Sequence, residues 1–114
     1  MRYRQNKYGA KRVKIDGYNF DSILEARRYE ELKLLGKAGE ISHLKVHPVF
    51  PIKIKGVHVC DVELDFYYQS EEDDISYQAN YEDCKGADTA ISKLKRKLFE
   101  AYYHNVVTLI RATR

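Results

Sequence analysis

Residues 57–85, VHVCDVELDFYYQSEEDDISYQANYEDCK, contain the two most regular alternations of apolar and polar side chains in this sequence. Alternation with a period of two is typical of a β-strand, so this stretch predicts strands over residues 57–68 and 75–85. The residues between them, 69–74, are polar and predict a turn. We therefore expect the fold to be built around these two strands.

The first of these strands places its acidic residues on one face, because successive side chains of a strand point to opposite faces. Asp61, Glu63 and Asp65 share that face. Three acids at alternate positions are typical of a solvated sheet face, and for Asp61 and Glu63 this is the favoured interpretation. The opposite face is expected to be core and carries Cys60, Val62, Leu64, Phe66 and Tyr68.

The second strand ends in an acid and a lysine on the same face. Asp83 and Lys85 share that face, whereas Glu82 and Cys84 lie on the other. Asp83 and Lys85 are close enough to share a metal ion, a water molecule and a phosphate. The alternative is an exposed ion pair at a strand end, which contributes about 0–1 kcal/mol. The Asp-x-Lys spacing arises often by chance and does not decide between them. The row that leads into this pair consists of Ile75, Tyr77, Ala79 and Tyr81.

Upstream of these strands the sequence predicts a hairpin, a helix and an irregular strand. Residues 13–20 alternate around an Asp-Gly pair, as in a hairpin with a two-residue turn. A helix is expected from residue 22 to 38, because Ser22-Ile-Leu-Glu fits a capping box and a glycine follows the last turn. Residues 44–54 predict an edge or irregular strand, since two prolines remove backbone donors.

Downstream, a helix is expected over residues 89–103 and a buried strand over 106–110. The order of hairpin, helix, three strands, helix and strand predicts an α/β domain with a mixed sheet flanked by helices. A length of 114 residues suits one domain spanning 1–114, in which residues 1–12 form a basic N-terminal arm. The apolar face of the second helix is expected to contain Ile91, Leu94, Leu98 and Tyr102.

The charges are segregated along the chain, although the net charge is only +3. Residues 1–14 hold six basic residues and no acid, residues 60–83 hold nine acids and no base, and residues 85–114 hold seven basic residues against two acids. Basic ends suit a polyanionic partner, and an acidic patch beside them suits a divalent cation that meets phosphate. The alternative is that the charges only solvate the surface.

Glu25 has two interpretations that periodicity alone leaves open. It closes the capping box with Ser22, or it leans inward on the helical stripe that it shares with Tyr29 and Leu32. A buried carboxylate costs free energy unless a partner or a metal ion receives it. The histidines are weaker candidates: His43 and His47 have no second pair of ligands, so a zinc site is not expected.

Several classes of protein are excluded or disfavoured. No stretch of about 18 apolar residues is present, so we expect no membrane partner, and the basic N-terminus lacks the apolar segment of a secretory signal. The two cysteines form no C-x-x-C pair and suit a reduced, cytoplasmic chain. The sequence contains no phosphate-binding loop, dinucleotide fingerprint or nucleophile elbow.

The succession of elements and acids resembles the core of the PD-(D/E)XK nuclease superfamily. The matching residues are Glu25 in FDSILEARRYEEL, Asp65 in VELDFYY, and Asp83 and Lys85 in YEDCKG. Residues 7–42 also resemble small phage-encoded nucleases related to archaeal-type Holliday junction resolvases. The chain departs from the superfamily pattern at Leu64, where the family name has proline, and at Asp83, which replaces the commoner glutamate.

The resemblance implies a Mg²⁺-dependent DNA endonuclease in which Mn²⁺ is able to substitute. It assigns metal binding to Asp65, Asp83, the Cys84 backbone carbonyl and Glu25. It implies that Lys85 holds the attacking water molecule or compensates the negative charge that develops on the phosphate. It implies a homodimer that makes paired cuts in four-way junctions, in the host cytoplasm if the chain is phage-encoded. The alternatives are a related nuclease that nicks or trims other DNA and a non-catalytic basic DNA-binding module. The expected phosphate contacts are Arg2, Arg4, Lys7, Lys11, Arg12, Lys93, Lys95 and Lys97.

Overall fold

The computed structural model describes residues 2–5 and 11–112, and the side chains from residue 12 to 112. The described residues contain two helices, α1 (Ile23–Lys37) and α2 (Ala90–Tyr103). They also contain nine strands: β1 (Arg2–Gln5), β2 (Lys11–Ile15), β3 (Tyr18–Phe20), β4 (Ile41–Val46), β5 (Val49–Ile54), β6 (Val57–Glu63), β7 (Phe66–Glu71), β8 (Tyr77–Cys84) and β9 (Val107–Ile110). None of the described helices is long and apolar enough to cross a membrane.

The central sheet has the order β4-β7-β8-β9 and is mixed, because β8 and β9 are parallel while the other pairs are antiparallel. The helix α2 connects the two parallel strands, as a crossover between parallel strands requires. Strands β1, β2 and β3 form a separate antiparallel sheet at the N-terminus, and β5 and β6 form a two-stranded sheet. The predicted mixed α/β fold with an N-terminal hairpin is confirmed, and Arg2–Gln5 in the expected basic arm adds a third strand to that hairpin.

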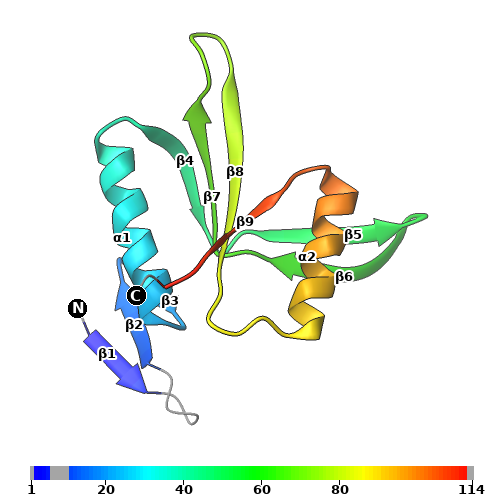
Figure 1. The fold of residues 1–114 in the computed structure, drawn as a ribbon, viewed down its shortest axis with the longest axis horizontal. Coiled ribbons are helices and arrows are strands. Elements are labelled where there is room, and N and C mark those ends of the chain that lie inside the picture. The colour runs from blue at the N-terminus through cyan, green and yellow to red at the C-terminus, as the bar shows by residue number, and fades with distance from the viewer. Residues whose placement is uncertain (1, 6–10, 113–114) are drawn as a thin grey trace.

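Each helix covers its own hydrophobic core, on opposite sides of the central strands (Figure 1). The core under α1 consists of Val13, Phe20, Ala26, Tyr29, Leu32, Ile41 and Phe66. The core under α2 consists of Ile52, Val62, Leu64, Phe99 and Val107. Leu64 and Phe66 belong to different cores although only one residue separates them, so Asp65 lies at the boundary.

The predicted single strands 57–68 and 44–54 are wrong, because each one breaks and continues in a different sheet. The first breaks at Leu64 and Asp65, and the second breaks at His47 and Pro48. The two breaks are bonded to each other: the His47 N–H donates to the Asp65 carbonyl at 2.9 Å, and the Leu64 N–H donates to the Pro48 carbonyl at 3.0 Å. His47 has a left-handed backbone with φ 54°, and Pro48 has no N–H, so the ladder is interrupted here.

Two predicted apolar faces are not buried as expected. Ile75, in the turn before β8, and Tyr77, its first residue, are exposed, because the outer part of the β7–β8 hairpin projects away from both cores (Figure 1). The helix α2 packs through Phe99 and Tyr103, whose rings meet Phe50 of β5. Consequently three residues of the predicted core face of α2 are exposed: Ile91, Leu94 and Tyr102.

Candidate functional site

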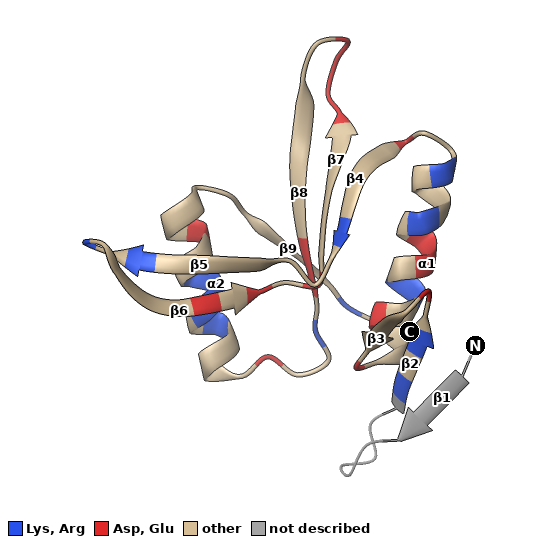
Figure 2. Ribbon diagram, turned by 180° about the vertical axis from the view of Figure 1, so that it is seen from behind, with Lys and Arg blue, Asp and Glu red and all other residues tan. Residues whose placement is uncertain are grey.

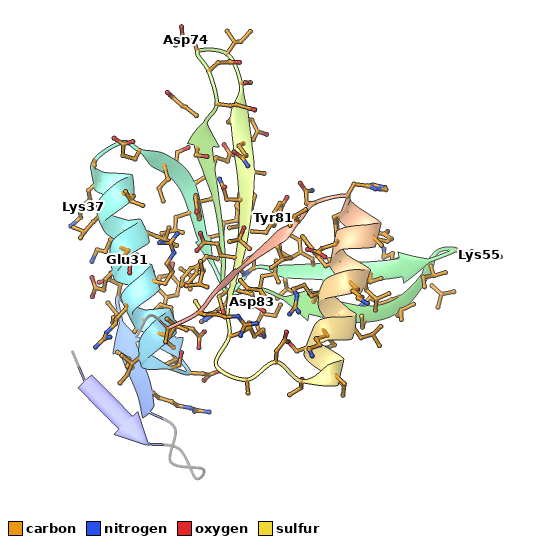
Figure 3. The ribbon with its side chains drawn as sticks, in the orientation of Figure 1. Glu31, Lys37, Lys55, Asp74, Tyr81 and Asp83 are labelled. Atoms are coloured by element: carbon orange, nitrogen blue, oxygen red, sulfur yellow. The ribbon has the colours of Figure 1, made fainter. Side chains whose placement is uncertain are left out.

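A polar pocket of about 370 Å³ lies where the two strand breaks meet the first turn of α1 and the end of β8. The four acidic and basic residues predicted for a nuclease site, at positions 25, 65, 83 and 85, all line it, although they come from three distant segments of the chain. Figure 3 places Asp83 at this end of β8, between the two helices. The complete lining is Asn19, Asp21, Glu25, His47, Glu63, Asp65, Asp83, Cys84 and Lys85.

Asp65 is held by backbone hydrogen bonds on both sides. Its carbonyl accepts from His47, its N–H donates to the carbonyl of Glu82 at 3.1 Å, and its Oδ2 accepts the N–H of Cys84 at 2.7 Å. The side chain is therefore fixed against the end of β8, with Oδ1 not involved in that contact. This placement follows from the break after Leu64, which turns the backbone of Asp65 out of β6 and toward β8.

Glu25 combines both roles that the sequence left open. Its N–H donates to Ser22 Oγ at 3.1 Å, and the Ser22 hydroxyl donates to Glu25 Oε2 at 3.2 Å, so the helix cap is formed. Glu25 is only 8% exposed, and its Oε1 lies 3.8 Å from Nε2 of His47 inside the pocket. The cap thus orients a carboxylate that also faces Asp65.

At the end of β8, neighbouring acids have different partners. Asp83 pairs with Lys85, with 2.8 Å between Oδ2 and Nζ, and both line the pocket. Glu82 faces α1 and forms a two-point ion pair with Arg28, through Nε at 2.8 Å and Nη2 at 2.7 Å. The Tyr68 hydroxyl donates to the same carboxylate. Glu82 therefore joins the end of β8 to α1 through Arg28, which follows Glu25 by three residues in the helix.

Three of the five acidic residues that line the pocket, Glu25, Asp65 and Asp83, resist simultaneous ionisation. Burial, reinforced by the nearby Glu25, raises the pKa of Asp65 to about 6. Burial also raises the pKa of Asp83 to about 6, although Lys85 opposes this, and burial raises the pKa of Glu25. Burial raises the pKa of the Cys84 thiol as well, so this thiol is not a ready nucleophile. A divalent cation among these carboxylates would relieve their repulsion.

His47 is a site residue that the sequence reasoning missed. One ligand atom each from Glu25, His47 and Asp65 lie within 4.8 Å of one another, a spacing suited to one metal ion. The His47 ring packs against Phe20, with 5.6 Å between ring centroids. A sequence signal for His47 was its position directly before Pro48, at the irregular part of the predicted strand. The sequence reasoning instead considered His47 together with His43, which is exposed and contacts Ser42. The donor set of carboxylate oxygens and one imidazole fits a divalent cation.

The predicted DNA contacts lie in three separate places where the structure describes their side chains. Lys95 lines a groove of about 560 Å³ that adjoins the pocket and shares Glu63, Asp83 and Lys85 with it. Lys93 and Lys97 instead line a separate hollow on the outer side of α2. Arg12 is exposed, 3.6 Å from Asp21. Lys7 and the side chains of Arg2, Arg4 and Lys11 lie outside the described residues.

The chain belongs to the family DUF1064, whose description is a protein of unknown function and which matches residues 5–114. No curated protein matches the chain. No solved structure matches it either. Family membership therefore carries no activity with it, and the pocket is the feature that points to a function.

Proposed function

We propose that this protein is a divalent-metal-dependent DNA endonuclease of the PD-(D/E)XK type. The observation that carries the proposal is the convergence of Glu25, Asp65, Asp83 and Lys85 in one pocket. These four residues come from the first turn of a helix, a strand break and a strand end, in the order in which the superfamily presents them. Asp61, which the sequence analysis assigned to a solvated face, does not line this pocket, and it bonds His58 instead.

Asp65 and Asp83 are the residues that would hold Mg²⁺ or Mn²⁺, with Glu25, the Cys84 carbonyl and His47 completing or orienting the ligand set. A bound divalent cation supplies Lewis-acid stabilisation of the charge that develops on the phosphate. The Cys84 N–H and the Ser22 hydroxyl keep Asp65 and Glu25 oriented before any ligand arrives. Preorganised groups of this kind need no rearrangement during the reaction.

Lys85 is the residue that would act on the water molecule or the phosphate. Its ammonium lies on the same face as Asp83 and is only partly exposed, so its charge is weakly screened by solvent. An ammonium donates hydrogen bonds and accepts none, which suits it to orient a water molecule and to compensate charge on a phosphate oxygen. Lys95 in the adjoining groove would extend this contact along the DNA backbone.

The finer part of the proposal is that the substrate is a four-way junction, cut in pairs by a homodimer in the cytoplasm. It is supported by the resemblance of residues 7–42 to small resolvases. A nuclease that nicks or trims other DNA would use the same pocket. The non-catalytic alternative is disfavoured by Glu25, Asp65 and Asp83, because a module that only binds phosphate gains nothing from buried and half-buried carboxylates gathered in one pocket.

A cleavage assay tests the activity and the substrate together. A labelled four-way junction and a linear duplex with the same arm sequences are incubated with the protein in Mg²⁺, Mn²⁺ or a chelator, beside an Asp65→Asn preparation. We expect paired nicks in the junction, no cleavage in chelator and none by the variant. Cleavage of both DNAs at equal rates would support the broader nuclease, and binding without cleavage in either metal would overturn the enzymatic proposal.

A further inference from the structure

The outer face of α2 is apolar, basic and uncovered in the described structure. Leu94 on this face is 58% exposed, although the helical periodicity predicts that it is buried. Lys93 and Lys97 flank Leu94, and all three line a hollow of about 470 Å³. The helix is fully anchored by its other side through Phe99, so this face is free to receive a partner.

A surface of opposite charge and similar apolarity lies on the β7–β8 hairpin. We name its outer part, residues 71–77, the acidic arm, because it begins with four consecutive acids. Ile75 in this arm is 96% exposed. Asp73 Oδ1 accepts the N–H groups of Ile75 at 2.9 Å and of Ser76 at 2.8 Å, so the turn holds this isoleucine in an outward position.

One molecule cannot join these two surfaces. The acidic arm projects from the body and its tip lies well away from α2 (Figure 1), and Figure 2 shows acids at the tip and basic residues on the helix. We infer that a second copy of this chain covers α2: the acidic arm of each protomer docks on α2 of the other, with Ile75 seated on Leu94 between Lys93 and Lys97. The contact is reciprocal, so it closes as a twofold dimer.

The charges favour this occupant over the pairing of two α2 helices. Helix pairing would bring Lys93 and Lys97 of both copies together, and like charges at an interface oppose association. The two acids nearest to these lysines are already engaged: Asp88, just before the helix, pairs with Arg96 at 2.7 Å, and Glu100 accepts the N–H of Val107 at 2.8 Å. The acidic arm supplies both the missing negative charge and an apolar contact for Leu94.

The experiment is a charge exchange read out as mass in solution, without DNA or metal, so it is independent of the nuclease proposal. The arm variant carries Glu72→Lys and Asp74→Lys, and it keeps Asp73, which forms the turn. The helix variant carries Lys93→Glu and Lys97→Glu. Wild type is expected to sediment as a dimer at micromolar concentration, and each variant alone as a monomer, with a dissociation constant raised at least about tenfold.

An equimolar mixture of the two variants should recover the dimer, since each mixed pair contains one reversed contact and one wild-type contact, both of them attractive. A chain with all four substitutions should dimerise for the same reason, which excludes misfolding as the cause of the monomers. Glu30→Lys with Glu40→Lys, and Lys53→Glu with Lys55→Glu, make the same net-charge changes on other exposed surfaces and should stay dimeric. A monomeric wild type, a dimeric arm variant or helix variant, or a mixture that stays monomeric would overturn the inference.

Discussion

Glu82 and Asp83 are consecutive residues of β8 whose side chains lie on opposite faces of the sheet and have unrelated partners. Glu82 is 3% exposed and binds Arg28 of α1, whereas Asp83 binds Lys85 in the polar pocket. The strand alternation thus separates an acid that joins two elements from an acid that is available to a metal ion. The superfamily pattern alone would confuse them, because glutamate is its commoner residue.

Asp83→Asn and Glu82→Gln should therefore have opposite effects. Asp83→Asn is expected to abolish metal-dependent cleavage and to leave the protein folded. Glu82→Gln should change the cleavage rate by less than about tenfold, or 1.4 kcal/mol in the barrier. It should lower the free energy of unfolding by about 1–3 kcal/mol, because the Arg28 guanidinium loses its buried charged partner and keeps only the exposed Glu31. Cleavage rates and denaturant titrations of both variants measure this, and an inactive, stable Glu82→Gln protein would contradict the assignment.

Asp65→Asn and Lys85→Ala should eliminate cleavage without eliminating DNA binding. Both residues line the pocket, and Lys85 also borders the adjoining groove, whereas Lys95, a proposed phosphate contact, lines the groove and not the pocket. Asn at position 65 can still accept the Cys84 N–H through its amide oxygen, so the backbone should stay in place. Binding is measured by fluorescence anisotropy in chelator, and cleavage in Mg²⁺. Wild-type cleavage by either variant would remove that residue from the site.

The raised pKa values predict how the metal-free protein responds to pH. Asp65 and Asp83 have a pKa of about 6 when folded, against about 3.9 in an unfolded chain. Between these values the folded state binds more protons than the unfolded state, so the free energy of unfolding falls as pH rises through this window. In chelator, Asp65→Asn should therefore raise the melting temperature at about pH 7.5 and change it little at about pH 4.5. A variant less stable than wild type at both values would contradict this.

The mixed α/β fold with its N-terminal hairpin was predictable from the sequence, except where two strands break and change sheet. Glu25, Asp65, Asp83 and Lys85 meet as their positions predicted, since helix caps and strand ends are readable locally. The strand breaks were not readable, because the burial of alternate residues continues through Leu64 although it passes from one core to another. When a chain passes from one sheet to another and the same alternate positions stay buried, the local sequence pattern does not indicate the change.

His47 and the outer face of α2 were missed for related reasons. The neighbours of His47 in the pocket are Glu25 of α1 and Asp65 in the break before β7, so no spacing along the sequence indicates them. For α2, the apolar periodicity predicts which side of the helix is apolar, but it does not predict which of those apolar residues contact the core. Phe99 and Tyr103 pack in the core, and Ile91 and Leu94 are therefore exposed to solvent.

Lys95→Ala should weaken DNA binding and reduce its dependence on salt. Each phosphate contact that is lost reduces the slope of log affinity against log salt concentration by about 0.9 for duplex DNA. Lys53→Ala is the matched control, because Lys53 is an exposed lysine of β5 that does not line the groove. Binding isotherms at several salt concentrations give both slopes. Equal slopes for the two variants would mean that the groove does not follow the DNA backbone.

His47→Ala should shift the preference of the pocket between two metal ions. Mg²⁺ takes oxygen ligands and keeps much of its water, whereas a first-row transition ion such as Mn²⁺ accepts an imidazole nitrogen more readily. His47 Nε2 lies near both Glu25 and Asp65, in a position to supply that nitrogen. The wild-type protein should therefore bind Mn²⁺ more tightly than Mg²⁺.

In His47→Ala the affinity for Mn²⁺ should fall by at least about tenfold while the affinity for Mg²⁺ changes little, because Mg²⁺ replaces the missing ligand with water. Calorimetric titration of the DNA-free protein with each metal measures both constants without relying on activity. His43→Ala is the matched control, since His43 is exposed and bonded to Ser42. An equal loss for both metals would mean that His47 only supports the shape of the pocket, and no loss for either would place it outside the metal site.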